Sequence, residues 1–260
     1  MVIRMKNVSF ARNKKPILKH INWEVQDGQH WAIVGLNGSG KTTLLNLVNG
    51  YIWPSTGELS VLGCDFGSTD VRELRKSIGW VSSSLQEKLY GNETALDIVL
   101  SGLFASFALF DNPAELDKMR ALELLEQLKC GHISQQPYKT MSQGEKQKVL
   151  IARAMISSPG LLILDEPCTG LDFFSREQLL STIQAISEWV TPPTLIYVTH
   201  YVEEILPVYT HLLLLKDGEV FLSGTIDEIL TGNNLSRFFG QTVDLVWDNN
   251  RAWMKMVSGK

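Results

Sequence analysis

Segment 35–42, with the sequence GLNGSGKT, constrains this 260-residue chain more than any other feature. It has the pattern G-x-x-x-x-G-K-[ST], in which glycines let a loop curl until consecutive backbone N–H groups point at one anion. An apolar run, 30–34, precedes the loop, and a segment with helical spacing, 42–49, follows it. The start of that helix adds the positive end of its dipole. Strand, glycine loop and helix in this order predict an α/β fold with a phosphate site.

The loop also carries the side chains that such a site needs. Lys41 is expected to reach the β- and γ-phosphates of a nucleotide, and the Thr42 hydroxyl to ligate Mg²⁺. The residues expected to contact the nucleotide are Gly35, Asn37, Gly38, Ser39, Gly40, Lys41, Thr42 and Thr43.

A pair of carboxylates, Asp165 and Glu166, ends the apolar run 161–164. A buried strand that ends there would deliver both side chains to the edge where open α/β sheets bind ligands. Asp165 is expected to hold Mg²⁺, directly or through water, and Glu166 to polarise the water that attacks the γ-phosphate. Taken alone, the pair could equally be two solvated carboxylates at a strand end.

The spacing Ser142-x-x-Glu145 before the helical run 149–156 is a capping box. The free N–H groups and positive dipole of a helix start could bind an anion or could merely begin a helix. From these residues alone, capping is the favoured interpretation.

Composition excludes several classes of protein. The chain has 24 Lys+Arg against 28 Asp+Glu, a formal charge of −4, which argues against a dedicated nucleic-acid binder. Its 44% hydrophobic residues supply a core and argue against disorder. No apolar run reaches the roughly 20 residues that span a bilayer. The three cysteines are far apart and lack metal-ligand spacing, so we expect reduced thiols in the cytoplasm.

Further along the chain, apolar runs alternate with helical segments. The runs 161–164 and 195–198 are uninterrupted, which favours parallel strands covered on both faces. The runs 211–216 and 219–222 flank Asp217-Gly218 and predict a hairpin.

Five motifs in this order resemble the nucleotide-binding domain of the ATP-binding cassette (ABC) superfamily: segments 35–42, 141–147, 165–166, 169–172 and 198–200. The resemblance runs from about residue 2 to 230. The stretch 35–52, with Trp31 and Trp53, is also faintly similar to the molybdenum-type transport ATPase group.

This resemblance implies a P-loop NTPase core with a mostly parallel sheet, an N-terminal antiparallel β subdomain and an inserted α-helical subdomain at about 87–157. It implies a single nucleotide-binding domain over 1–232 and leaves 233–260 as a C-terminal extension of unknown role. The implied ligands are ATP and Mg²⁺.

Segment 141–145 resembles the family's signature sequence, usually Leu-Ser-Gly-Gly-Gln, which binds the γ-phosphate of an ATP held by the other protomer. Ser142 and Gly144 keep the pattern, whereas Gln143 and Glu145 depart from it. All four are expected to contact the nucleotide. Glu145 places a negative charge where the family commonly has Gln, and this should weaken ATP-dependent closure.

The resemblance gives roles to residues that would be unremarkable alone. Gln86 is implied to approach Mg²⁺ and the attacking water, Asp172 to lie at the dimer seam, and His200 to contact the γ-phosphate. Where the family stacks an aromatic side chain on adenine, this chain has Arg12, whose guanidinium plane can also stack. Phe10 lies two residues away and is the alternative.

The implied function is that of an ATPase whose two copies, as a homodimer or heterodimer, sandwich two ATP molecules head to tail. Hydrolysis would drive a separate integral membrane permease, with the protein bound peripherally on the cytoplasmic face of the cell membrane. The apolar segment 96–110 is either a buried helix or a groove for that partner. The alternative function is a soluble single-cassette ATPase with a regulatory cytosolic role.

Overall fold

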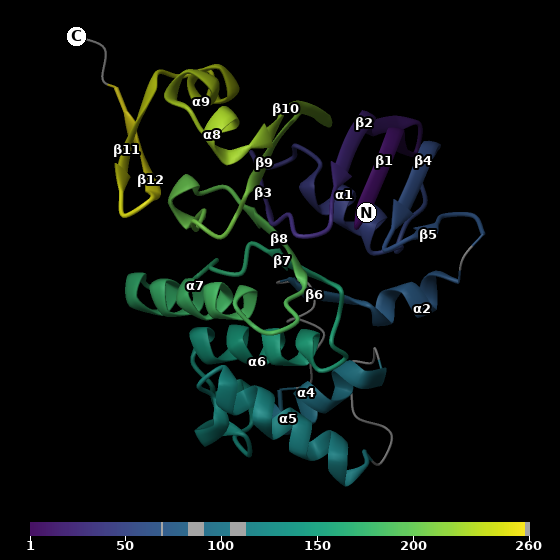
Figure 1. The fold of residues 1–260 in the computed structure, drawn as a ribbon, viewed down its shortest axis with the longest axis vertical. Coiled ribbons are helices and arrows are strands. Elements are labelled where there is room, and N and C mark those ends of the chain that lie inside the picture. The colour runs from purple at the N-terminus through teal and green to yellow at the C-terminus, as the bar shows by residue number, and fades with distance from the viewer. Residues whose placement is uncertain (69, 83–90, 105–112, 258–260) are drawn as a thin grey trace. The chain divides into compact units, whose positions relative to one another are not determined.

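The computed structural model describes residues 1–68, 70–82, 91–104 and 113–257. The chain divides into two compact units, one made of Met1–Leu74 and Thr194–Lys260 and the other of Arg75–Pro193. Each unit combines strands with helices, as the sequence predicted (Figure 1).

The first unit holds most of the strands. Its elements are β1 (Ile3–Arg12), β2 (Lys15–Val25), β3 (Trp31–Gly35), α1 (Lys41–Val48), β4 (Thr56–Val61), β5 (Cys64–Asp65), β8 (Thr194–Thr199), η4 (Val202–Glu204), β9 (His211–Lys216), β10 (Glu219–Thr225), α8 (Ile226–Ile229), α9 (Gly232–Phe239), β11 (Val243–Asp248) and β12 (Arg251–Met256).

The second unit is mainly helical. Its elements are β6 (Ile78–Ser82), α4 (Ala95–Ser101), η1 (Gly102–Phe104), α5 (Glu115–Gln127), η2 (Gly131–Ile133), η3 (Tyr138–Thr140), α6 (Gln143–Met155), β7 (Leu161–Asp165) and α7 (Phe173–Ser187). Between the two units the chain runs through α2 (Val71–Lys76).

The N-terminal strands form the predicted antiparallel sheet, in the order β2-β1-β4-β5 (Figure 1). The turn between β1 and β2 places Asn13 and Lys14 at φ 52° and 65°. Two consecutive positive φ angles suit a tight hairpin, because they follow the right-handed twist of the strands.

The central strands of the first unit form a parallel arrangement. β3 lies between β8 and β9 and runs parallel to both, and all residues of β3 and β8 are buried. This confirms the expectation from the uninterrupted apolar runs. The predicted hairpin is also present: β9 and β10 pair antiparallel, and Asp217 and Gly218 take φ 51° and 80° at the turn.

In the second unit, β6 and β7 pair in parallel, and helices α4, α5 and α6 pack together (Figure 1). Within segment 96–110, the side chains of Ile98, Val99 and Leu100 in α4 are buried. This part of the segment fits the buried-helix interpretation, while residues 105–110 lie outside the described part of the chain.

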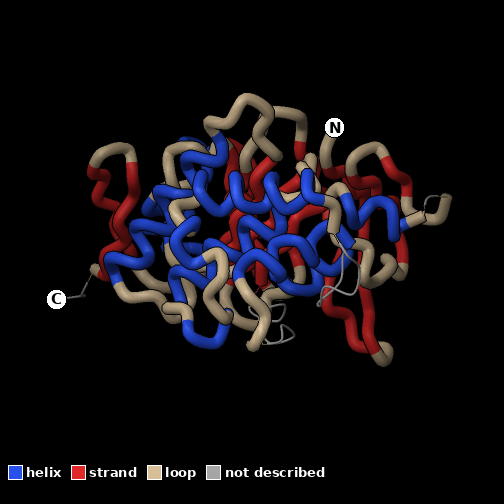
Figure 2. Tube along the Cα trace, turned by 90° about the horizontal axis from the view of Figure 1, so that it is seen from below, coloured by secondary structure: helices blue, strands red, loops and turns tan. Residues whose placement is uncertain are grey.

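The C-terminal segment is folded into the first unit. Leu235 and Phe238 of α9 are fully buried, and β11 and β12 form a hairpin near the C-terminal end (Figure 2). Across the described ranges, none of the helices combines the length and the apolar character needed to cross a bilayer.

Candidate nucleotide site

The phosphate loop joins β3 to α1 in the first unit. Gly40 is the N-cap of α1, with φ 106°, and no side chain caps the first turn. The first N–H groups of an α-helix have no partners within the helix. The start of α1 therefore presents backbone donors and a positive dipole, as a phosphate site requires.

Two glycines in the loop are required by close packing. A Cβ atom at Gly35 would lie 2.5 Å from Ser39 Oγ, and one at Gly40 would lie 2.7 Å from Leu18 Cδ2. A Cβ at Gly35 would also lie 2.9 Å from the backbone oxygen of Leu215, and the φ of 106° at Gly40 is one that residues with a side chain rarely adopt, so a larger residue would strain the loop at either position.

Two buried polar side chains lie inside this curl. Lys41 Nζ donates to the carbonyl oxygens of Gly35 at 2.7 Å and Leu36 at 3.3 Å, which folds the ammonium group back over the loop. The buried Ser39 hydroxyl has no hydrogen-bond partner among the described residues. A buried cation, an unsatisfied hydroxyl and an uncapped helix start fit the phosphate chain of a nucleotide.

A distant turn, itself bonded to β2, supports the loop from outside. Gly218 N, in the turn between β9 and β10, donates to Ser39 O at 3.0 Å, and Lys19 N donates to Gly218 O at 2.8 Å. The sequence predicts this hairpin, but no local signal shows that its turn packs on the phosphate loop. The contact joins residues almost 180 positions apart.

His200 follows β8 directly, and strand register places it near the loop. Thr199, the last residue of β8, pairs with Val34, which precedes Gly35 at the end of β3. Parallel strands end at the same edge of their sheet, so His200 leaves the sheet where the phosphate loop begins. The His200 side chain is half-buried, and its ring lies 4.0 Å from the ring of Tyr201, centroid to centroid.

The two candidates for the adenine contact lie on β1. Arg12 is exposed beside the hairpin turn, while Phe10 is half-buried and pairs with Leu18, the residue that packs against Gly40. Phe10 is therefore the candidate whose strand partner touches the phosphate loop.

In the second unit, Asp165 and Glu166 lie at the carboxyl end of β7, and both are half-buried. Asp165 pairs with Ser82 at the end of β6. Glu166 has a φ of 50°, rare for a residue with a side chain, and its carbonyl accepts from Thr169 N at 3.1 Å. Such strain is found at functional sites more often than elsewhere. Gln86 lies outside the described residues.

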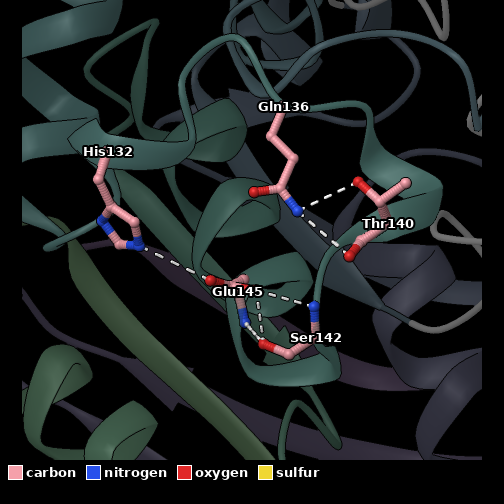
Figure 3. A network of polar contacts seen from close by, with 5 residues as sticks. All are labelled: His132, Gln136, Thr140, Ser142 and Glu145. Atoms are coloured by element: carbon pink, nitrogen blue, oxygen red, sulfur yellow. Dashed lines mark hydrogen bonds and ion pairs between the residues drawn. The ribbon is translucent and has the colours of Figure 1, made fainter.

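The signature segment opens α6 with the predicted capping box (Figure 3). Glu145 Oε2 accepts from Ser142 N at 2.8 Å and from Ser142 Oγ at 2.7 Å, and Glu145 N donates to Ser142 Oγ at 3.3 Å. The other oxygen, Oε1, lies 3.7 Å from His132 Nε2. The hydrogen bond from the Ser142 hydroxyl is the main cause that lowers the pKa of Glu145. Glu145 is therefore ionised at neutral pH.

Asp172 caps the neighbouring helix α7 in a similar way. Its carboxylate accepts from Ser175 N at 3.0 Å and from Ser175 Oγ at 2.6 Å, and these bonds lower the pKa of Asp172. A Cβ at Gly144 would lie 3.5 Å from Ser175 Cβ. The starts of α6 and α7 thus meet, and Ser142, Gly144, Glu145 and Ser175 line one cavity of about 740 Å³.

Three further site residues have their side chains at or near the surface. Thr42, in the first turn of α1, and Gln143, in the first turn of α6, are exposed, while Thr43 is half-buried. The Thr42 hydroxyl and the Asp165 carboxylate are hard oxygen donors, the type that Mg²⁺ prefers. The residues predicted to hold the metal fit it in their chemistry.

Comparison with known proteins identifies the family. A family model described as "ABC transporter" matches residues 18–169, more than half of the chain. The chain belongs to the ABC transporter family. It is an ATP-binding cassette with the P-loop NTPase fold, and the cassettes of this family hydrolyse ATP.

Similar proteins agree with this assignment. The uncharacterized ABC transporter ATP-binding protein YlmA of Bacillus subtilis is 49% identical over 255 residues, 98% of this chain and 97% of YlmA. CbiO1 of Clostridium perfringens, part of the ABC transporter complex cbiONQ, superposes with a TM-score of 0.78 at 25% identity, covering 91% of this chain and 93% of cbiO1. The cassette MJ0796, in a dimeric post-hydrolysis state with ADP and Pi, gives a TM-score of 0.73 at 26% identity, covering 86% of this chain and 99% of MJ0796.

Proposed function

We propose that this ABC cassette is the ATP-hydrolysing subunit of a transporter. Two copies bind two Mg-ATP molecules head to tail, and hydrolysis drives a separate integral membrane permease from the cytoplasmic side. The pairing of Thr199 with Val34 carries the proposal, because it brings the predicted switch histidine to the start of the phosphate loop. The dimeric state of MJ0796 and the place of cbiO1 in a transporter complex support it.

Each composite site takes its parts from two protomers. One protomer supplies the phosphate loop, Gln86, the Asp165-Glu166 pair and His200. The other supplies 142–145 and places Asp172 at the seam. ATP stabilises the dimer because it contacts both halves, and loss of the γ-phosphate removes that link. Arg12 or Phe10 stacks on the adenine ring.

The soluble alternative, a cytosolic regulatory ATPase, shares the same nucleotide chemistry. A small-molecule kinase would need the phosphate loop but neither the signature nor the switch histidine. Binding to a membrane partner is therefore the property that distinguishes the transporter function from the regulatory one.

Glu145 gives a direct test of the head-to-tail arrangement. Its ionised carboxylate accepts the proton of the Ser142 hydroxyl, so neither group can donate to a phosphate. Glu145→Gln removes one negative charge beside the partner's γ-phosphate and supplies an amide donor. We expect the dissociation constant of the ATP-bound dimer to fall about fivefold, which is on the order of the free energy of one screened charge interaction.

The measurement is light scattering during gel filtration, with Mg²⁺ and a slowly hydrolysed ATP analogue, over a range of protein concentrations. Glu123→Gln, an exposed carboxylate on α5, is the matched control and should dimerise like the wild type. If wild type and Glu145→Gln both stay monomeric, or if Glu145→Gln dimerises more weakly, the head-to-tail arrangement is contradicted.

A further inference from the structure

A carboxylate lies buried four residues after the switch histidine. Glu204, in η4, is only 3% exposed. Its Oε2 accepts hydrogen bonds from Tyr197 OH at 2.9 Å and from Thr199 Oγ1 at 2.6 Å. Both donors belong to β8. A buried carboxyl group is destabilising unless it is hydrogen-bonded, so these two hydrogen bonds stabilise Glu204 in the core.

The Thr199 hydroxyl makes a second hydrogen bond. While its proton goes to Glu204, its oxygen accepts from the backbone N–H of Tyr201 at 3.0 Å. Thr199 and Tyr201 are the two neighbours of His200. One hydroxyl therefore ties together the residues before and after the histidine, and the carboxylate of Glu204 sets the direction of that hydroxyl.

The other side of η4 is held by the C-terminal hairpin. Arg251 of β12 donates through Nε to the carbonyl oxygen of Glu203, and its guanidinium lies 5.2 Å from the ring centroid of Trp253. Other residues of β12 also pack against η4. Glu204 thus sits on a short helical turn that is anchored at β8 and at β12.

We propose that Glu204 is a positioning residue that aligns His200 with the phosphate loop through Thr199. The proposal rests on the role of His200 in the proposed function. Thr199 is fixed beside Val34 by strand pairing, so only the segment after Thr199 can turn toward or away from the loop. The hydrogen bond from Tyr201 N to Thr199 Oγ1 limits this movement of the segment. Because the Thr199 hydroxyl donates its proton to Glu204, the lone pairs of Thr199 Oγ1 stay available to accept the hydrogen bond from Tyr201 N.

Glu204→Gln tests this with little change of volume. The Glu204 carboxylate accepts from Thr199 Oγ1, whereas an amide in its place can donate to that oxygen and compete there with the N–H of Tyr201. We expect kcat for ATP hydrolysis to fall about 10-fold or more, since small misplacements of a catalytic group have effects of this size or larger. The equilibrium Kd for ATP should stay within about twofold. Glu203→Gln, one residue earlier, is the control and should match the wild type.

A second pair of variants keeps the test independent of how well Glu204→Gln folds. Thr199→Val removes the hydroxyl at constant shape and should lower kcat as Glu204→Gln does. Thr199→Ser retains the hydroxyl and should recover most of the lost rate.

The decisive comparison uses a His200→Ala background, which should itself hydrolyse ATP slowly. If Glu204 acts through His200, Glu204→Gln should lower the rate no further in that background. A further 10-fold fall there, or a loss of ATP affinity that parallels the loss of kcat, overturns the proposal. A wild-type rate for His200→Ala also overturns it, while leaving the dimerisation test of the proposed function to be judged separately.

Discussion

Glu166→Gln is expected to bind Mg-ATP, to form a stable dimer with it and to lose hydrolysis almost completely. Glu166 follows β7 with a strained φ of 50° and is the residue we assign to polarise the attacking water. Gln has nearly the same shape but cannot accept a proton. General base catalysis contributes about 10²–10⁴-fold, so kcat should fall by at least 100-fold.

The two effects are measured separately. Phosphate release gives kcat, and light scattering with Mg-ATP gives the fraction of dimer, which should exceed that of the wild type because the ATP bridge persists. Glu188→Gln, an exposed carboxylate after α7, controls for the loss of a charge in the same unit. Hydrolysis by Glu166→Gln at the wild-type rate would remove the assignment of Glu166 as the base.

Two inactive variants are expected to regain activity when they are mixed. Lys41→Met removes the charge from the phosphate loop while keeping the buried stem. In the proposed head-to-tail dimer, Gly144→Asp places a charge beside the partner's γ-phosphate, and Asp in the first turn favours the helix that starts there. Its Cβ has room, at 3.5 Å from Ser175 Cβ. Each variant alone should be inactive.

In a head-to-tail dimer, a mixed pair contains one site with both defects and one with none. Half of the dimers in an equal mixture are mixed, so about a quarter of the wild-type rate should return. The rate is followed by phosphate release at several mixing ratios. Lys41→Met mixed with Gly40→Ala, two defects in the same loop, should stay inactive. An inactive mixture of Lys41→Met and Gly144→Asp would show that each site is built from a single protomer.

The sequence predicted those parts of the site that depend on local chemistry. The glycine pattern lies directly before α1 as predicted, and the box Ser142-x-x-Glu145 begins a helix in the structure as the spacing required. The Asp217-Gly218 turn formed because both residues tolerate positive φ. Each of these signals lies within a few residues of the feature it predicts.

Other parts of the site depend on contacts between distant segments. The support of Ser39 by Gly218 joins distant loops, and the anchoring of η4 by Arg251 joins the C-terminal hairpin to the switch segment. Glu204 carries no pattern of its own, since an acidic residue after a strand usually faces solvent. Its burial depends on the hydroxyls that β8 turns toward it, and only the folded chain shows them.

The most direct test of the transporter function is purification of the tagged protein from detergent-solubilised native membranes, with mass spectrometry of the proteins that accompany it. The proposal predicts a stoichiometric partner with several membrane-spanning segments, whose identity would also indicate the cargo. Recovery with soluble proteins only, or alone, in a preparation that still hydrolyses ATP would contradict a transport role and favour the cytosolic ATPase.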